Sequence, residues 1–255
     1  MSKLLTRPET IGVVFAILAY LCFSLLDTIQ KTLIIYYSVF QILFIKYFFT
    51  FLLSIIESKR KKNFKFYLTY NWRLQLLRSL LSLLESGCFI LAFRYLSLAD
   101  AHSIGALTPI VVVVFSFIFL KEKISLKIWI AVFIGFIGVL IVMRPGLSVF
   151  DPMSIIPLTA AFFLGLYQIV TRKVSANDKN ETSLFYSGVI GIFLMSFISF
   201  YFWKPISVNF IILFVGVGVF YSLGLYFQII ALSKARASIV QPFHYTLIFY
   251  LFYFL

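Results

Sequence analysis

The sequence predicts an all-α integral membrane protein with about nine transmembrane helices, arranged as two inverted repeats. Hydrophobic residues fill 62% of the 255 positions and charged residues only 12%, with a mean hydropathy of +1.03. Soluble domains average about 45–50% apolar and about 25% charged residues, so this excess cannot be buried in a soluble core. Apolar stretches of about 20 residues, the length that a bilayer requires, follow one another along the chain. Two of these stretches, at 99–123 and 234–255, are interrupted by Pro109 and Pro242.

The first five predicted helices occupy residues 12–29, 39–56, 76–96, 101–120 and 127–143. Each is an apolar run that ends where charged or helix-breaking residues begin. A basic loop that starts at Lys59 separates the second run from the third, and Lys121 with Lys123 closes the fourth. The segment Arg144-Pro145-Gly146 ends the fifth run, because proline and glycine rarely continue a helix.

The four remaining helices are predicted at residues 154–171, 183–203, 208–232 and 237–255. Five helices precede the junction at residues 145–152, and this odd number inverts the second half relative to the first. The chain is therefore divided into a first repeat, residues 1–148, with five helices, and a second repeat, residues 149–255, with four.

The basic residues predict the orientation of the chain in the membrane. With a cytoplasmic N-terminus, Lys46 lies within a helix and the outside loops carry only four of the 22 Lys and Arg residues, namely Lys31, Arg94, Arg144 and Lys204. Cytoplasmic loops of membrane proteins carry such an excess of positive charge. The same rule accounts for the net charge of +13 without nucleic acid, so no nucleic-acid partner is expected.

Several short motifs resemble one known family over nearly the whole chain. In the first half these are Asp27 and Lys31 at the end of the first helix, AFRYLSLADA, Pro109, LKEKIS and GVLIVMRPG; in the second half they are LYQIVTRKVS, LFYSGVIG and ASIVQPFHYT. In their order and spacing they resemble EamA-type permeases of the drug/metabolite transporter superfamily. The last motif is similar to bacterial members that take up S-adenosylmethionine or riboflavin. The resemblance implies ten helices, whereas nine are predicted before Leu255, so a tenth helix is expected to be missing.

Lys46 and Glu85 are the first candidates for a substrate pathway. A charge near the bilayer centre costs about 2.5–3.5 kcal/mol on insertion scales, so it needs a partner or a water-filled cavity. The two residues lie near the middle of antiparallel helices, at similar depth. They are expected either to face a central cavity, paired or with substrate between them, or to form a structural ion pair between two helices.

Asp27 and Lys31 lie four residues apart at the outer end of the first helix, so they share one face. One interpretation is a salt bridge that reaches toward the membrane surface. The other is a site at the outer mouth of the transport pathway.

The other candidates for the substrate pathway are polar or kinked positions at membrane depth. His102 and His244 can couple transport to protons, since imidazole titrates near neutrality, or simply line the cavity. Pro109 and Pro242 each remove a backbone hydrogen bond, which frees a carbonyl for solute or merely bends the helix. The remaining residues offer hydrogen bonds to solute or between helices: Thr108, Tyr167, Gln168, Gln228, Gln241 and Tyr245.

These observations predict a multi-pass transporter of the bacterial inner membrane, with two repeats that rock around a midplane cavity. The cavity is expected to be lined chiefly by the first, third, fourth, sixth, eighth and ninth helices. The expected partners are a small organic solute and membrane lipid, a homodimer is left open, and no cofactor or metal is expected. An enzyme is disfavoured because acidic and histidine residues are few and unclustered. The main alternative is a non-transporting membrane module or a truncated remnant.

Overall fold

The computed structural model describes residues 7–144, 146, 149 and 151–254, and within them the chain forms helices and loops but no strand. Seven helical stretches of these residues are long and apolar enough to cross a membrane. They are Arg7–Tyr36, Val39–Arg60, Trp72–Tyr95, Leu98–Leu120, Pro152–Val174, Asn180–Tyr201 and Val208–Lys234. A shorter apolar helix covers Leu126–Val142. The prediction of an all-helical, multi-pass membrane protein is therefore confirmed. Half of the predicted junction between the repeats, residues 145, 147, 148 and 150, lies outside the described residues.

The helices in chain order are α1 (Arg7–Tyr36), α2 (Val39–Arg60), α3 (Trp72–Tyr95), α4 (Leu98–Gly105), α5 (Thr108–Leu120), α6 (Leu126–Met143), η2 (Pro152–Ser154), α7 (Ile155–Val174), α8 (Asn180–Tyr201), α9 (Val208–Lys234), α10 (Ala237–Val240), η3 (Gln241–Tyr245) and α11 (Thr246–Phe254). Polar side chains cap the starts of α2, α3, α4 and η2, because the first N–H groups of a helix lack backbone partners. The Ser38 hydroxyl accepts from the N–H of Phe40, and the Asn71 side chain accepts from the N–H of Leu74.

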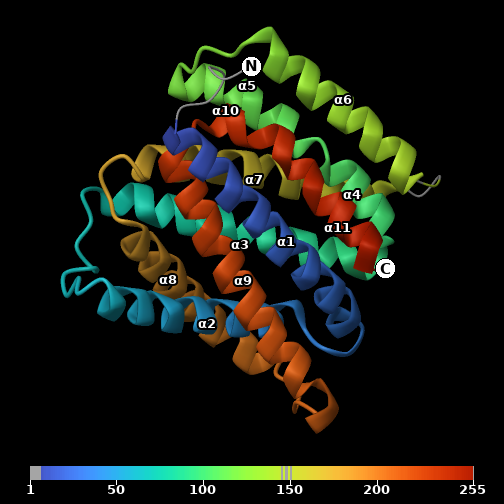
Figure 1. The fold of residues 1–255 in the computed structure, drawn as a ribbon. Helices are drawn as coiled ribbons and strands as arrows, with labels where there is room; N and C mark the ends of the chain where they lie inside the picture. Colours follow the sequence, from blue (N-terminus) through green and yellow to red (C-terminus); the bar gives the residue numbers. More distant parts are fainter. Residues whose placement is uncertain (1–6, 145, 147–148, 150, 255) are drawn as a thin grey trace.

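The long helices pack in pairs that are distant in sequence. α1 lies along α9, α3 along α7 and α2 along α8 (Figure 1). Glycine permits two of these close contacts. A Cβ on Gly188 would lie 2.7 Å from the backbone of Phe51 in α2, and one on Gly12 would lie 2.6 Å from the Cβ of Ala235. The absence of a side chain thus lets the helix backbones approach closely, as is common between membrane helices.

The two proline-containing segments are broken, as the sequence indicates. Leu98–Leu120 divides into α4 and α5, and Pro109 stands in the first turn of α5, where its missing N–H is tolerated. The C-terminal segment divides into α10, η3 and α11, with Pro242 in η3. The two segments meet at their ends, because the Glu122 carboxylate accepts hydrogen bonds of 3.1 Å from the N–H groups of Ala237 and Ser238.

Candidate functional site

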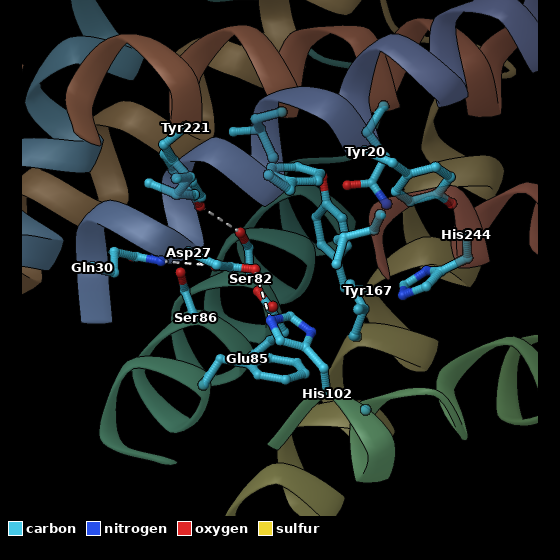
Figure 2. Close-up of a pocket in the computed structure, with 18 of the residues that line it drawn as sticks. Tyr20, Asp27, Gln30, Ser82, Glu85, Ser86, His102, Tyr167, Tyr221 and His244 are labelled. Atoms are coloured by element: carbon cyan, nitrogen blue, oxygen red, sulfur yellow. Dashed lines mark hydrogen bonds and ion pairs between the residues drawn. The ribbon is translucent and has the colours of Figure 1, made fainter. Parts of the chain in front are cut away.

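A cavity lies between the helices, with polar and aromatic side chains on its walls. Its lining comes from α1, α3, α4, α7, α9, η3 and α11, which are the segments expected to line it, and α2 adds Lys46. Figure 2 shows these side chains converging from different helices. The polar and aromatic members are Tyr20, Phe23, Asp27, Gln30, Lys46, Ser82, Glu85, Ser86, Phe89, His102, Tyr167, Tyr221, Gln228 and His244.

Lys46 is 1% exposed, and its ammonium is held by neutral groups. It donates to the Gln30 side-chain oxygen at 3.0 Å and to the Ser86 hydroxyl, and it lies 4.1 Å from the centre of the Tyr221 ring. No direct ion pair joins Lys46 to Glu85 among the described residues, but both side chains line the cavity, and the alternative in which substrate lies between them stays a prediction. Within the described part of the chain, Glu85 forms neither a hydrogen bond nor an ion pair. The positions of Lys46 and Glu85 along their helices predicted that the two charges lie at similar depth. In the structure, the Gln30 amide oxygen and the Ser86 hydroxyl lie within hydrogen-bond distance of the ammonium instead.

The expected salt bridge between Asp27 and Lys31 is also absent from the contacts of these described residues. Lys31 donates to the carbonyls of Phe93 at 2.6 Å and Leu96 at 2.8 Å, at the C-terminal end of α3. The last carbonyls of a helix lack intrahelical partners and favour a cation, which explains why the lysine turns away from the aspartate. Lys31 does not line the cavity, so the structure does not group it with Asp27.

Asp27 instead points into the cavity. Its Oδ1 accepts from the Gln30 amide at 2.9 Å, and its Oδ2 lies 3.4 Å from Nε2 of His102. Gln30 therefore links Lys46 to Asp27, since its oxygen accepts from one and its nitrogen donates to the other. The result is a polar chain that crosses from α2 through α1 to α4. Figure 2 shows Gln30 and Asp27 on the same side of the cavity.

The two histidines occupy aromatic surroundings on different walls. The His102 ring packs between Phe89 and Phe93, with ring centres 6.2 and 5.6 Å away. The His244 ring lies 4.9 Å from that of Tyr20. The Tyr20 hydroxyl and Nδ1 of His244 are buried and have no hydrogen-bond partner among the described residues. Buried polar groups normally find partners, so these two atoms are available to a ligand.

Of the residues singled out in the sequence, seven line the cavity: Asp27, Lys46, Glu85, His102, Tyr167, Gln228 and His244. The others lie behind its wall. Gln241 donates to the side-chain oxygen of Gln168 at 2.8 Å, so these two bond to each other. The Tyr245 hydroxyl donates to the Ala106 carbonyl at 3.4 Å. Thr108, Pro109 and Pro242 are likewise outside the lining, with Thr108 and Pro109 buried.

Sequence reasoning missed Tyr20, Gln30, Ser82, Ser86 and Tyr221. A periodic signal for α3 was present in the sequence, because Ser82, Glu85, Ser86 and Phe89 recur at the spacing of one helix face.

Sequence reasoning also missed Arg78, which the charge pattern groups with the cytoplasmic loops. Arg78 is fully buried and donates to Gln75 at 3.0 Å, to Ser187 at 2.9 Å and to the Ser183 carbonyl. Its guanidinium lies 5.9 Å from the ring of Tyr167, directly beside the cavity.

The fold and the site together define a polytopic α-helical membrane protein with a polar cavity among its helices. A family model described as the EamA-like transporter family matches residues 10–144. The chain therefore belongs to the EamA-like transporter family.

Curated relatives agree with this assignment. A riboflavin transporter from Vibrio cholerae is 28% identical over 193 residues, which cover 75% of this chain and 62% of that protein. The match thus spans less than two thirds of that relative. An S-adenosylmethionine uptake transporter from Rickettsia conorii is 25% identical, covering 92% of this chain and 79% of its own. A solved crystal structure aligns over 94% of this chain and 84% of its own with a TM-score of 0.75 and 14% identity, so the fold is shared.

Proposed function

We propose that the protein carries a small organic metabolite across the bacterial inner membrane by alternating access. The observation that carries this proposal is the cavity, in which eight elements from both halves of the chain surround unpaired polar groups. Pockets for small organic ligands typically combine apolar walls with a few placed polar groups, as this cavity does. The solute contacts proposed are Asp27, Lys46, Glu85, His102, Tyr167, Gln228 and His244.

The proposal includes nine membrane segments in two inverted repeats, residues 1–148 and 149–255, with a cytoplasmic N-terminus. Matching contacts in the two halves support it. Lys31 in α1 binds carbonyls at the C-terminal end of α3, and Arg172 in α7 donates to the carbonyls of Leu232 and Ser233 at the C-terminal end of α9. Repeated units with opposite orientation are the usual basis for rocking around a midplane site.

A second matched pair of contacts involves the residues one helical turn before Lys31 and Arg172. Asp27 precedes Lys31 by one turn and contacts His102, while Gln168 precedes Arg172 by one turn and bonds Gln241. His102 and Gln241 lie equally far from the N-cap residues of α4 and α10. Each broken segment is thus held to the long helix that starts its own repeat, and Pro109 and Pro242 are proposed to let these segments bend.

The named candidates for the solute are S-adenosylmethionine and riboflavin, which come from the names of the relatives. Both contain ring systems that suit a cavity with the side chains of Tyr20, Phe23, Phe89, Tyr167 and Tyr221 on its walls.

Uptake into proteoliposomes containing the purified protein tests the proposed function. We expect uptake of at least one of the two radiolabelled solutes above that of protein-free vesicles. Ser82→Trp places a large ring in the cavity and should abolish uptake, whereas Ser196→Trp, on an exposed face of α8, should not. Size-exclusion profiles establish that both variants fold. No uptake of any solute in a metabolite panel would favour the non-transporting alternative.

A further inference from the structure

Glu85 is a carboxylate on the wall of the cavity for which the described residues supply no hydrogen bond and no ion pair. The other charged groups of the cavity already have partners. Lys46 donates to Gln30 and Ser86 and lies near the ring of Tyr221, and the Asp27 carboxylate accepts from the Gln30 amide. An unpaired charge in such surroundings is costly, so Glu85 calls for a positively charged ligand.

The charge balance of the cavity points the same way. Its lining carries two carboxylates, Asp27 and Glu85, but only one ammonium, that of Lys46. The nearby Arg78 guanidinium is held behind the wall by Gln75, Ser183 and Ser187, so it does not face the cavity as Lys46 does. A cation placed there gains from attraction in a region where water screens little.

The aromatic side chains add a second requirement. Phe89 lies one turn after Glu85 on the same face of α3, and Tyr167 and Tyr221 lie on other walls. Aromatic faces attract cations and stack on planar rings. In Figure 2, Tyr20 and His244 lie together, away from Gln30 and Ser86, and their unpartnered polar atoms suit hydrogen-bonding groups at the other end of a solute.

We infer that the cavity takes an aromatic solute with a fixed positive charge, and that Glu85 is the carboxylate that faces this charge. The inference rests on the proposed transport function and narrows its substrate to organic cations. Between the two named candidates it selects S-adenosylmethionine, whose sulfonium is positively charged, over riboflavin, which is neutral.

Equilibrium binding to the purified, detergent-solubilised protein tests this inference with matched ligands. S-adenosylmethionine and S-adenosylhomocysteine differ in the methyl group that gives the sulfur its positive charge. 1-Methylnicotinamide, which is methylated on the ring nitrogen and is therefore a cation, and neutral nicotinamide form a second such pair. We expect the wild-type protein to bind at least one cation about tenfold or more tightly than its neutral partner, as a charge-assisted contact would produce. Glu85→Gln should bring that ratio close to one, and Glu85→Asp should retain most of it.

Glu9→Gln provides the matched control, because this carboxylate bonds Arg236 at the end of α1 and does not line the cavity. Its ratio should equal that of the wild type. Equal binding of both members of each pair, binding of riboflavin alone, or a preference that survives in Glu85→Gln would overturn the inference. A Glu85-dependent preference for the cation without flux in proteoliposomes would support the inference and contradict the transport function.

Discussion

At the scale of single residues, buried charges are held by groups that no spacing rule identifies. Arg78 is the clearest case, because its guanidinium joins α3 to the start of α8 through the Ser183 carbonyl and the Ser187 hydroxyl. Gln75, one turn earlier, orients it and also bonds Asp178 at 2.8 Å. These contacts close the end of the bundle beside Tyr167, so we expect Arg78 to stabilise the protein rather than to contact solute.

Replacing Arg78 by Met keeps much of the side-chain length but removes the hydrogen bonds to α8. A hydrogen bond to a charged group contributes about 1.5–3 kcal/mol, so we expect a clear loss of thermal stability in detergent, measured by intrinsic fluorescence. Arg73→Met is the matched control, since Arg73 is exposed and its guanidinium lies 5.7 Å from the centre of the neighbouring Trp72 ring. A melting temperature for Arg78→Met equal to that of the control would contradict this role.

The residue scale also shows what the sequence can and cannot predict. Lys46 and Glu85 were recognisable as cavity residues, because a charge within an apolar helix requires polar surroundings, whereas Asp27 was expected in a salt bridge or at the outer mouth. Their partners were not, because spacing within one helix gives the face but not the neighbours that other helices contribute. Lys31 donates to a carbonyl at the end of α3, and Arg78 donates to a carbonyl at the start of α8. The sequence around each of these residues does not predict which other helix end lies beside it.

At the scale of elements, the broken segments depend on contacts made by neighbouring chain ends. α5 ends at Lys121, whose φ of 53° is in the left-handed region, and the chain then brings Glu122 to the start of α10. The carboxylate accepts from two backbone N–H groups and, at 2.5 Å, from the Ser238 hydroxyl. A negative charge at a helix start complements its unpaired N–H groups, so a residue of the first half fixes the entry of the last segment.

Replacing Glu122 by Ala should therefore loosen α10 and η3 without unfolding the bundle. Loss of a helix cap costs about 0.5–2 kcal/mol, which predicts faster hydrogen exchange of backbone amides at residues 237–245. Exchange measured by mass spectrometry in detergent would reveal this change. Lys123→Ala, two positions from the helix end and exposed, should exchange like the wild type. Uniformly faster exchange over all helices would indicate general destabilisation instead.

At the scale of the whole molecule, the sequence predicted the membrane class and the approximate helix positions well. Hydropathy and length suffice for that, because the bilayer imposes both. The pairing of α1 with α9, α3 with α7 and α2 with α8 could not be predicted from the sequence. It depends on contacts between distant helices, such as that of Gly188 with Phe51. The proposed inverted arrangement is consistent with this crossed pairing, in which each half contributes one helix to every pair.

The orientation of the molecule in the membrane is open to a direct test. The loop at Lys62 follows the C-terminal end of α2, whereas Lys204 contacts Gln41 and Tyr36 near its start, so these lysines lie at opposite ends of a 22-residue helix. At about 1.5 Å per residue this helix spans the hydrocarbon layer, and the positive-inside rule places Lys62 in the cytoplasm. In a background with Cys22→Ala and Cys88→Ala, a membrane-impermeant maleimide applied to intact cells should label Lys204→Cys but not Lys62→Cys. As a control, both cysteines should be labelled after the cells are permeabilised. The reverse pattern in intact cells would show that the topology is inverted. Equal labelling in intact cells would show that the two loops do not lie on opposite sides of the membrane.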